Sequence, residues 1–425
     1  MHPEAEQLNG TIGNNNPVVL SMLSTRGKDI YFPKKGILGQ TAEAKGKKIN
    51  ATIGMALEDD GSPLCLQTIA SQVKLPKENV FLYSSSYGNL ALRKKWQQLI
   101  FAKNPSLKTK PISLPVVTCA LTHGLSIAAY LFGNDEIIIP EPFWGNYRLI
   151  FTNTFGTKIK TFPLFEGSRL NTKELAKILA NDLSMVLLNY PNNPTGYTPT
   201  EKEADELVQI IHKAAMQGHK IIILIDDAYF GLVYEQGIFQ ESLFAKLADL
   251  HKNVLAVKID GATKEDYVWG LRVGFVTFGI KGGSPKLYEA LEAKAAGAVR
   301  GTISNAPNIS QSLVLHSLED PNYTKQKKEK YETLKRRYIK VKEIIATHKE
   351  YQPYFTPLPF NSGYFMCIEV KESETVRKIL LEKFDTGIIA LPGIIRIAFS
   401  GTPYDQLEEL FENIYKACKL INKAK

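Results

Sequence analysis

Three polar motifs in the middle of the chain each follow an apolar run. Residues 191–196 read Pro-Asn-Asn-Pro-Thr-Gly, residues 226–229 read Asp-Asp-Ala-Tyr, and residues 260–264 read Asp-Gly-Ala-Thr-Lys. Taken singly, each has an ordinary explanation, because Asn-Pro-Thr-Gly forms turns, an aspartate after a strand caps helices, and a loop lysine is usually solvated. Because the three motifs occur in succession, each directly after an apolar run, we interpret them as parts of one site. A lysine amine can attack a carbonyl and carry a proton when burial or neighbouring cations lower its pKa.

The elements that must position these motifs follow from the apolar pattern. Between about residues 90 and 315, short runs rich in valine and isoleucine alternate with helical patterns such as Thr200–Gly218, which starts with a capping-box sequence. Runs that are apolar on both faces are typical of buried strands in a mostly parallel sheet. The predicted strands are Val116–Leu121, Glu136–Ile139, Lys158–Phe162, Met185–Asn189, Ile221–Ile225, Val254–Ile259 and Val273–Phe278. Ligands collect beyond the carboxyl ends of such strands, where all three motifs stand.

The length and the two chain ends predict two domains, because 425 residues exceed one ordinary core. The first 60 or so residues are polar and turn-rich and begin as a loose arm. A long charged helix, short strands near 363–370 and 394–400, and a helix from Asp405 follow residue 325. We expect an α/β fold with a mostly parallel seven-stranded sheet in a large domain at 63–322. Residues 1–62 and 323–425 would supply the N-terminal arm and a smaller α+β domain built from both ends.

The composition argues against several classes of protein. It is typical of a soluble globular chain, with no apolar run near the ~18 residues that cross a bilayer and no secretory signal at the start, so we expect a cytoplasmic protein without membrane contact. The four scattered cysteines favour reduced thiols over a disulfide frame or a metal site. The net charge is +9, but the basic stretch 325–342 carries acidic residues at helical spacing. A solvated helix face therefore explains it better than nucleic-acid binding.

The combined motifs resemble the fold-type I pyridoxal phosphate enzymes, and within them the class I/II aminotransferases of the aspartate and aromatic type, over nearly the whole chain. The resemblance implies that Lys264 holds pyridoxal 5′-phosphate as a Schiff base and moves the substrate α-proton. Asp226 would pair with the protonated pyridine nitrogen and keep the ring an electron sink. Asp227 is the alternative for that role, but the family's Asp-x-Ala-Tyr pattern falls on Asp226.

The same resemblance assigns further residues to the cofactor. Asn193 and Tyr229 would donate to the phenolic oxygen of the ring, and Arg272 would clamp the phosphate. The backbone amides of Leu121 and Thr122 would also bind the phosphate, because that segment follows a strand and opens a helix.

Trp144, in Pro-Glu-Pro-Phe-Trp-Gly-Asn-Tyr at 140–147, would stack on the ring. The family often has glycine or serine where Ala120 stands, and serine or asparagine where Gly261 stands. Two hydroxyl ligands of the phosphate are therefore missing, and we expect more reliance on Arg272, Thr122 and Thr263.

The substrate side rests on two arginines. Arg396 resembles the family's strand arginine that binds the substrate α-carboxylate, beside Asn193 and Trp144. The stretch between Pro392-Gly393 and Arg396 is shorter than is common in relatives. Arg300 matches an arginine that crosses the dimer interface to a side-chain carboxylate, although a helix-end arginine that caps carbonyls is the alternative.

Two further residues complete the predicted site. Gly54 would let the backbone approach the substrate. Tyr83 matches a tyrosine that reaches the phosphate of a neighbouring subunit, which implies a homodimer with shared sites. An ordinary helix-start turn is the alternative reading of that segment.

The predicted function is ping-pong transamination from an amino acid, with aspartate, glutamate or an aromatic residue as the expected donor, to a 2-oxo acid such as 2-oxoglutarate. The alternatives are another reaction of the same fold, such as carbon–sulfur lysis, decarboxylation or a synthase reaction. A non-catalytic regulatory protein that binds pyridoxal phosphate is a further alternative, but the polar residues before the sheet domain lack the paired helices of a DNA-binding module.

Overall fold

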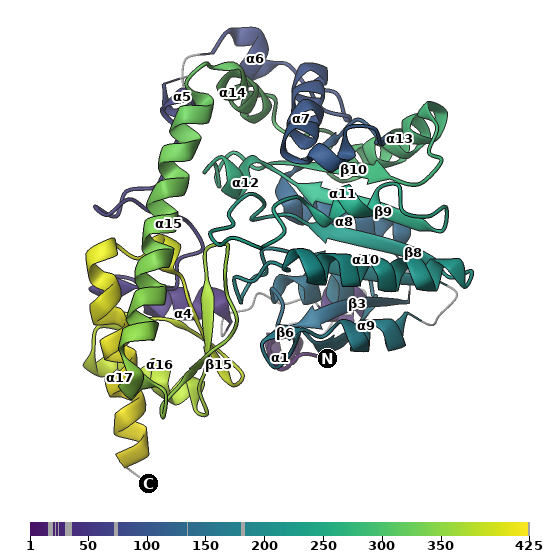
Figure 1. The fold of residues 1–425 in the computed structure, drawn as a ribbon. Helices are drawn as coiled ribbons and strands as arrows, with labels where there is room; N and C mark the ends of the chain where they lie inside the picture. The colour runs from purple at the N-terminus through teal and green to yellow at the C-terminus, as the bar shows by residue number, and fades with distance from the viewer. Residues whose placement is uncertain are drawn as a thin grey trace.

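Seven strands form the central sheet of the computed structural model, which describes residues 1–15, 20–21, 23, 25–29, 36–71, 75–133, 135–179 and 183–423 (Figure 1). The order is β2-β10-β9-β8-β7-β3-β4. The bounds are β2 Val116–Cys119, β3 Glu136–Glu141, β4 Lys158–Pro163, β7 Leu183–Asn189, β8 Lys220–Asp226, β9 Val254–Asp260 and β10 Val273–Gly279. Only β10 runs antiparallel to its neighbours in this sheet. The predicted seven-stranded, mostly parallel sheet is confirmed.

Helices cover the sheet because its strands are apolar on both faces. Every residue of β10 is buried, and β9 is buried except at Leu255. Helix α8 (Ala120–Phe132) packs against β2, β9 and β10, whereas α10 (Glu201–Met216) packs against β8 and β9 and lies in front of the sheet in Figure 1. The predicted capping box of α10 is present between Thr200 and Glu203.

The predicted strand Val116–Leu121 is wrong at its last two residues. Strand β2 ends at Cys119, and Ala120 begins α8 with a φ of 62°. The apolar pattern continues past the strand because Ala120 and Leu121 belong to the buried face of the helix. This tight entry brings the first turn of α8 to the edge of the sheet where the polar motifs stand.

A second sheet gathers residues from the C-terminal part of the chain. Its antiparallel order is β11-β12-β15-β14. Its strands are β11 Thr356–Pro357, β12 Met366–Glu369, β14 Ile389–Leu391 and β15 Ile394–Ile397. The two-residue strands β1 (Ile49–Asn50) and β13 (Thr386–Gly387) pair in parallel, so both chain ends contribute here, as predicted. The residue bounds of the two domains stay a prediction.

The first residues are not a loose arm, which corrects the expectation. Helix α1 (Pro3–Asn15) forms there, with Glu4 and Glu6 in its first turn. It packs against α3 (Thr25–Asp29), and Asn9 Nδ2 donates to Lys28 O at 2.9 Å. A polar sequence was compatible with both states, and Ala5 is the buried residue among the described side chains of α1.

The remaining helices surround the two sheets, with the long helix α15 running down one side of the molecule (Figure 1). Their bounds are α4 Ile37–Glu43, α5 Gln67–Ala70, α6 Lys77–Phe81, α7 Leu90–Lys103, α9 Thr172–Ile178, α11 Leu243–Leu247, α12 Ala262–Glu265, α13 Pro285–Thr302, α14 Asn308–Glu319, α15 Tyr323–Thr347, α16 Ser373–Lys383 and α17 Leu407–Lys423. Among the described residues, no helix combines the length and apolar character needed to cross a membrane.

Candidate active site

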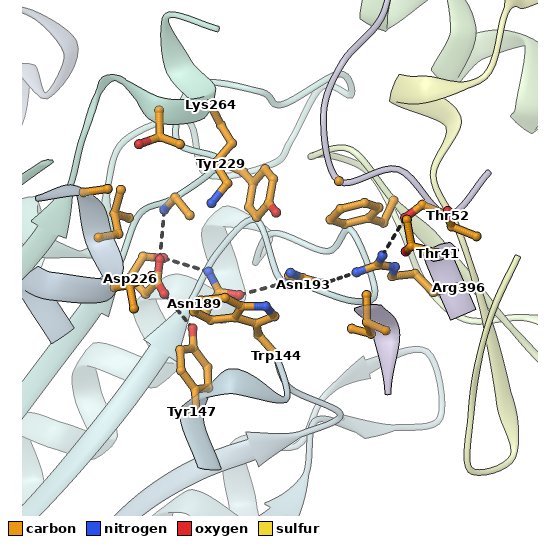
Figure 2. Close-up of a pocket in the computed structure, with 18 of the residues that line it drawn as sticks. Thr41, Thr52, Trp144, Tyr147, Asn189, Asn193, Asp226, Tyr229, Lys264 and Arg396 are labelled. Carbon is orange, nitrogen blue, oxygen red and sulfur yellow. Dashed lines mark hydrogen bonds between the residues drawn. The ribbon is translucent and has the colours of Figure 1, made fainter. Parts of the chain in front are cut away.

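A cavity of about 300 Å³ lies at the carboxyl ends of β7, β8 and β9, between the large sheet and residues from both chain ends (Figure 2). This is where an open α/β sheet collects ligands, and the volume suits a small molecule. The predicted site residues that line it are Gly54, Leu121, Thr122, Trp144, Asn193, Asp226, Tyr229, Thr263, Lys264, Arg272 and Arg396. The structure therefore brings together residues that are as much as 342 positions apart in the chain, from Gly54 to Arg396.

Lys264 lies in the short helix α12, directly after β9, and its side chain points into the cavity (Figure 2). Its Nζ is 5.1 Å from the centroid of the Tyr229 ring. Burial lowers the pKa of Lys264, and the charge of Arg272 lowers it further against the opposing charge of Asp226. A larger share of the amine is then neutral near pH 7, which is the form that attacks a carbonyl or accepts a proton.

Asp226 and Asp227 are consecutive at the end of β8, but their side chains lie in different environments. Asp226 lines the cavity, where its Oδ2 accepts from the Tyr147 hydroxyl at 2.7 Å and its Oδ1 from the Ala228 amide at 3.0 Å. Asp227 does not line it and bonds Ser242 and Lys258 instead. Burial raises the pKa of Asp226, whereas the hydrogen bond from Tyr147 and the charge of Lys264 oppose that rise.

Tyr147 and Asn189 are part of the site, and sequence reasoning gave neither of them a role. Asn189 Nδ2 donates to the backbone oxygen of Asp226 at 2.9 Å, and its Oδ1 accepts from the Asn193 amide at 2.8 Å. Both residues are buried, and Figure 2 shows them beside Asp226. Tyr147 stands three positions after Trp144, and Asn189 ends the run before the Asn-Pro-Thr-Gly motif, so a polar residue at each place was the available signal.

The turn that carries Asn193 is held by the C-terminal part of the chain. The amides of Asn361 and Ser362 both donate to Gly196 O at 2.9 Å. Gly196 has a φ of 72°, and a Cβ there would lie 1.9 Å from Phe365 O, so only glycine fits. The contact between Gly196 and the Phe365 backbone joins the turn that carries Asn193 to the segment that carries Phe365. Both Asn193 and Phe365 line the cavity.

One end of the cavity is equipped for an anion. The first turn of α8 supplies Leu121 and Thr122, and a helix N-terminus favours negative charge. Thr263 Oγ1 is buried and has no hydrogen-bond partner within the described residues. Arg272 lines the same cavity, and its φ of 55° is unusual for a residue with a side chain.

The structure explains why position 261 is glycine and carries no hydroxyl side chain for the phosphate. A Cβ at this position would lie 2.5 Å from Val273 O and 2.7 Å from Gly274 Cα, so the backbone of β10 leaves no room for serine or asparagine. The close approach of the two backbones takes the place that a hydroxyl side chain would occupy. Any phosphate bound here must therefore rely on the remaining donors.

The other end of the cavity holds Arg396, which is buried in β15 between β12 and β14. Its Nη1 donates to Asn193 Oδ1 at 3.3 Å and its Nη2 to Thr52 O at 3.2 Å, while its Nε has no partner among the described residues. The guanidinium carbon lies 4.2 Å from the Phe365 ring centroid. Arg396 forms no ion pair within the part of the chain described, and a buried cation of this kind is suited to an incoming carboxylate.

The short segment before Arg396 is a tight hairpin. Leu391 pairs with Ile394 across Pro392-Gly393, and Gly393 has a φ of 75°. Helix α4 lies against this hairpin, because the Gln40 side chain bonds both the amide and the carbonyl of Ala390, at 2.7 and 2.9 Å. Ile37 and Thr41 of α4 line the cavity, so the N-terminal segment covers the side that the short hairpin leaves open.

Trp144 and Gly54 also meet the cavity. The Trp144 ring lies edge-on to Tyr147, with centroids 5.5 Å apart, and is partly exposed, which leaves a face free for stacking. A Cβ at Gly54 would have nothing within 4 Å, so any need for glycine there comes from a ligand and not from the protein.

Tyr83 and Arg300 do not line the cavity in the single chain. The Tyr83 side chain is 92% exposed, and it borders a separate surface depression. Arg300 is exposed in the last turn of α13, where its Nη1 donates to Ser304 Oγ at 2.8 Å. Both could reach this kind of site only in a neighbouring copy, so their roles stay predictions.

The donor set of the cavity fits pyridoxal phosphate. Asp226 offers a buried carboxylate to a ring nitrogen, and Trp144 offers an aromatic face. The Thr263 hydroxyl, which has no partner among the described residues, and Arg272 of the same cavity fit an anionic tail, and Lys264 offers an amine with a lowered pKa. Within the described residues, no cluster of histidine, cysteine, aspartate and glutamate has the geometry of a metal site.

Comparisons with known proteins agree with this geometry. The profile of the family "Aminotransferase class I and II" matches residues 46–414. An aspartate aminotransferase of Bacillus subtilis (strain 168) is 25% identical over 394 residues, covering 87% of this chain and 93% of the relative. An aromatic-amino-acid aminotransferase 2 of Thermococcus litoralis is 23% identical, covering 79% and 84%.

Solved structures show the same fold. An aminotransferase from Anaerococcus prevotii superposes with a TM-score of 0.82 at 24% identity, covering 93% of this chain and 98% of that one. A cytoplasmic aspartate aminotransferase from Saccharomyces cerevisiae gives a TM-score of 0.75 at 21% identity, covering 92% and 98%.

Proposed function

Because the chain belongs to the class I and II aminotransferases, we propose that it exchanges amino groups by a ping-pong mechanism in which Lys264 carries the proton. The protein is a pyridoxal phosphate-dependent transaminase of fold type I, and its substrates are an amino acid and a 2-oxo acid. The observation that carries the residue assignment is the placement of Lys264, Asp226 and Arg396 around one cavity.

Pyridoxal phosphate, when bound, supplies an electron sink for the charge left on the substrate α-carbon. We assign its ring nitrogen to Asp226 and its ring face to Trp144. The residues assigned to the phenolic oxygen are Asn193 and Tyr229, and burial raises the pKa of Tyr229, which keeps the phenol a donor. The residues assigned to the phosphate are Leu121, Thr122, Thr263 and Arg272.

Lys264 is the proposed covalent anchor and proton carrier. Its lowered pKa supports both roles, because a neutral amine is needed each time a proton leaves the α-carbon. Trp144, Tyr229 and Phe365 line the same cavity as the amine, and the Tyr229 ring centroid lies 5.1 Å from Lys264 Nζ. Lys264 would return the proton on the other side of the exchange, and a water molecule would then release the product oxo acid by hydrolysis.

Arg396 is the proposed site of the α-carboxylate shared by all amino acids and 2-oxo acids. Within the described residues, its buried Nε has no hydrogen-bond partner and its guanidinium forms no ion pair, which supports this assignment. Asn193 bridges the two halves of the site, because it contacts Arg396 and is bound through its backbone amide by Asn189. A carboxylate on Arg396 would thus be coupled to the groups that hold the cofactor.

The proposed donors are aspartate, glutamate or an aromatic amino acid, with 2-oxoglutarate as an acceptor. Among the described residues that line the cavity, the cations are Lys264, Arg272 and Arg396, and each has another proposed task. A second substrate carboxylate therefore needs a cation from elsewhere, and Arg300 of a second copy is the candidate. The partly exposed Trp144 ring supports an aromatic donor equally well.

A homodimer with shared sites is part of this proposal. Phe81, Leu82 and Tyr83 are consecutive and are 79%, 62% and 92% exposed, which is a costly apolar surface for a single chain. Covering it with a second copy would bury these side chains and bring Tyr83 and Arg300 toward the partner's cavity.

The experiment is a donor screen on the cofactor-loaded enzyme without acceptor. Each candidate donor is added, and the release of its 2-oxo acid and the conversion of the cofactor to pyridoxamine phosphate are measured together. Stoichiometric formation of both products supports transamination. Release of carbon dioxide or of a thiol, with the cofactor unchanged, would overturn it. When the screen is repeated with Arg300→Ala, conversion of aspartate and glutamate should fall, whereas conversion of aromatic donors should not change.

A further inference from the structure

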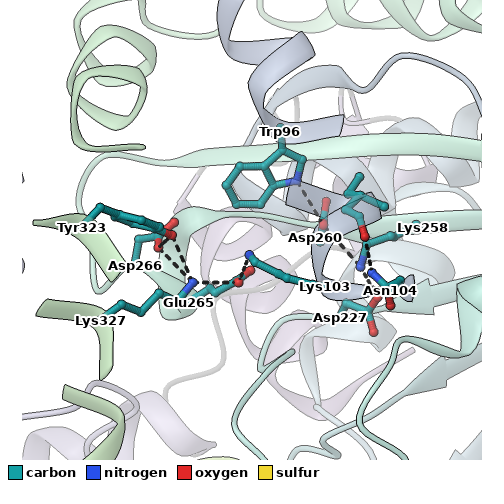
Figure 3. A network of polar contacts seen from close by, with 11 residues as sticks. Trp96, Lys103, Asn104, Asp227, Lys258, Asp260, Glu265, Asp266, Tyr323 and Lys327 are labelled. Atoms are coloured by element: carbon teal, nitrogen blue, oxygen red, sulfur yellow. Dashed lines mark hydrogen bonds and ion pairs between the residues drawn. The ribbon is translucent and has the colours of Figure 1, made fainter. Parts of the chain in front are cut away.

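A buried charge cluster, which we call the Lys258 cluster, consists of Asp227, Lys258 and Asp260 (Figure 3). Lys258 Nζ bonds Asp227 Oδ2 and lies 3.3 Å from Asp260 Oδ2. Asp227 also accepts from Ser242 Oγ at 2.6 Å, and Asp260 from Trp96 Nε1 at 3.1 Å. Lys258 is fully buried, which is rare for lysine and costs free energy unless the charge has a task or close partners.

The strand geometry places this cluster directly behind Asp226. Strands β8 and β9 are parallel, with Ile225 opposite Lys258 and Asp226 opposite Ile259. The amide of Asp227 donates to Ile259 O at 2.9 Å, which extends the pairing past the end of β8. Because side chains alternate along a strand, Asp226 enters the cavity while Asp227 turns to Lys258. Lys258 is therefore not a second amine of the active site.

The charges around Asp226 do not balance without Lys258. Asp226 and Asp227 are adjacent buried carboxyls, and Asp260 is a third. The titratable groups that act on Asp226, or on the cluster behind it, are Tyr147, Asp227, Tyr229, Lys258, Asp260, Lys264 and Glu265. Of these only Lys258 and Lys264 are cations, and a neutral Lys264 contributes no charge. Lys258 then remains as the cation of this set, against the three buried aspartates Asp226, Asp227 and Asp260.

Burial raises the pKa of all three aspartates, and the charge of Lys258 works against that rise in each of them. Although burial also disfavours a charged lysine, Asp227 and Asp260 raise the pKa of Lys258 above its usual range. The two aspartates therefore favour the charged form of Lys258 at neutral pH, and that charge acts on Asp226.

We propose that Lys258 is a positioning residue that holds the Asp226 carboxylate in its charged form, so that Asp226 can pair with the protonated ring nitrogen of the cofactor. This inference rests on the role proposed above for Asp226. A merely structural ion pair would hold the β8 and β9 ends together but would not change how Asp226 responds to pH.

The two explanations differ in the sign of a measurable shift. Without Lys258, Asp226 loses a positive charge that lowers its pKa, while the acidic groups behind it remain, so it takes up a proton at a higher pH. Without the Asp227 charge, Asp226 has one fewer negative neighbour and keeps its charge to a lower pH. A purely structural defect would weaken both variants in the same direction.

The test measures binding of pyridoxamine 5′-phosphate to the cofactor-free enzyme between about pH 5 and 9. This probe has no carbonyl, so it does not react with Lys264, and its affinity reports on the ring nitrogen and phosphate contacts. We compare the wild type with Lys258→Met, Asp227→Asn and the double variant. Arg337→Met is the matched control, because Arg337 is also a fully buried cation but pairs with Asp59 and Ser400.

The affinity should fall as the pH decreases through the pKa of Asp226. For Lys258→Met this midpoint should move to higher pH by about one unit, as expected for the loss of one close charge, and for Asp227→Asn it should move to lower pH. The double variant should lie between them, and Arg337→Met should lower the unfolding temperature without moving the midpoint. If Lys258→Met does not fold, Asp227→Asn and the double variant still decide the matter.

Unmoved midpoints, or shifts of the same sign in Lys258→Met and Asp227→Asn, would overturn the inference. A separate variant, Asp226→Asn, tests its premise. If Asp226→Asn binds the probe like the wild type at every pH, the role of Asp226 itself fails. If that variant loses the pH dependence while Lys258→Met keeps the wild-type midpoint, only the role of Lys258 fails.

Discussion

Asp226 and Asp227 are neighbours in the chain, yet their carboxylates belong to different environments. Asp226 accepts from the Tyr147 hydroxyl at 2.7 Å inside the cavity, whereas Asp227 accepts from the Ser242 hydroxyl at 2.6 Å behind it. The pleat of β8 separates them, because successive side chains point to opposite faces. Of the two aspartates in the Asp-Asp-Ala-Tyr motif, only Asp226 can reach a ligand beside Lys264.

Asp226→Asn should therefore leave the fold intact and damage the chemistry. The amide keeps the size of the side chain and its place beside Tyr147 but removes the negative charge that a protonated ring nitrogen needs. Breaking a buried charge pair costs about 3–5 kcal/mol, which corresponds to a fall in kcat/KM of at least about 100-fold. Steady-state kinetics with a confirmed donor, together with an unfolding curve, check this. Activity within a factor of three of the wild type would contradict it.

Arg396→Lys should raise KM for the amino acid and the oxo acid alike. Lysine keeps the charge but loses the forked pair of donors that matches a carboxylate. The loss of one charged hydrogen bond is worth about 1.5–3 kcal/mol, so KM should rise roughly 10- to 100-fold. Cofactor affinity, measured by titration of the cofactor-free protein, should not change. Equal loss of cofactor and substrate binding would point to a collapsed site instead.

Arg272→Ala should weaken cofactor retention by about 10- to 100-fold, because a charge-assisted contact to the phosphate is lost. The effect should be large in this chain, since the backbone of β10 excludes a hydroxyl side chain at Gly261. Dialysis against phosphate buffer, followed by the residual cofactor absorbance, measures retention. Unchanged affinity for Arg272→Ala would show that the main-chain amides and Thr263 suffice.

Much of this site follows from the sequence, because local patterns determine it. The ends of three strands place Asn193, Asp226 and Lys264 at one edge of the sheet, and a short polar motif follows each of these strands. Relationships between distant segments could not be read in this way. The bond from Tyr147 to Asp226 and the burial of Lys258 depend on how strands and helices pack, and a polar residue beside a motif or within an apolar run does not identify its partner.

The chain ends illustrate the same limit. The sequence of helix α1 is polar and did not predict a helix. Its packing against α3 is a contact between separate segments that the local pattern does not show. The packing of α4 against the short hairpin includes the Gln40 side chain bonding Ala390, 350 positions away. Tyr83 and Arg300 were predicted from the resemblance, and a single chain cannot bring them to its own cavity.

Lys264→Met should stabilise the cofactor-free protein. Burial lowers the pKa of Lys264 in the folded state relative to the ordinary value of about 10.4. The unfolded chain therefore binds more protons between these two values, so the native amine costs stability at neutral pH and this cost disappears as the pH rises toward 10.4. A gain of about 1 kcal/mol would raise Tm by about 1 °C at pH 7 and by less at pH 10.

Differential scanning calorimetry at the two pH values checks this prediction. Lys94→Met is the matched control, because Lys94 is exposed on α7 and should leave Tm unchanged. A lower Tm for cofactor-free Lys264→Met at pH 7 would show that the amine is not under strain from burial.

The most direct test of the central claim locates the cofactor on the chain. The purified enzyme is loaded with pyridoxal phosphate, reduced with borohydride, digested and mapped by mass spectrometry. The account predicts a phosphopyridoxyl group on Lys264 and on no other lysine, including the buried Lys258, and no modified peptide in Lys264→Ala. A label on another lysine, or a protein that takes up no pyridoxal phosphate, would contradict it.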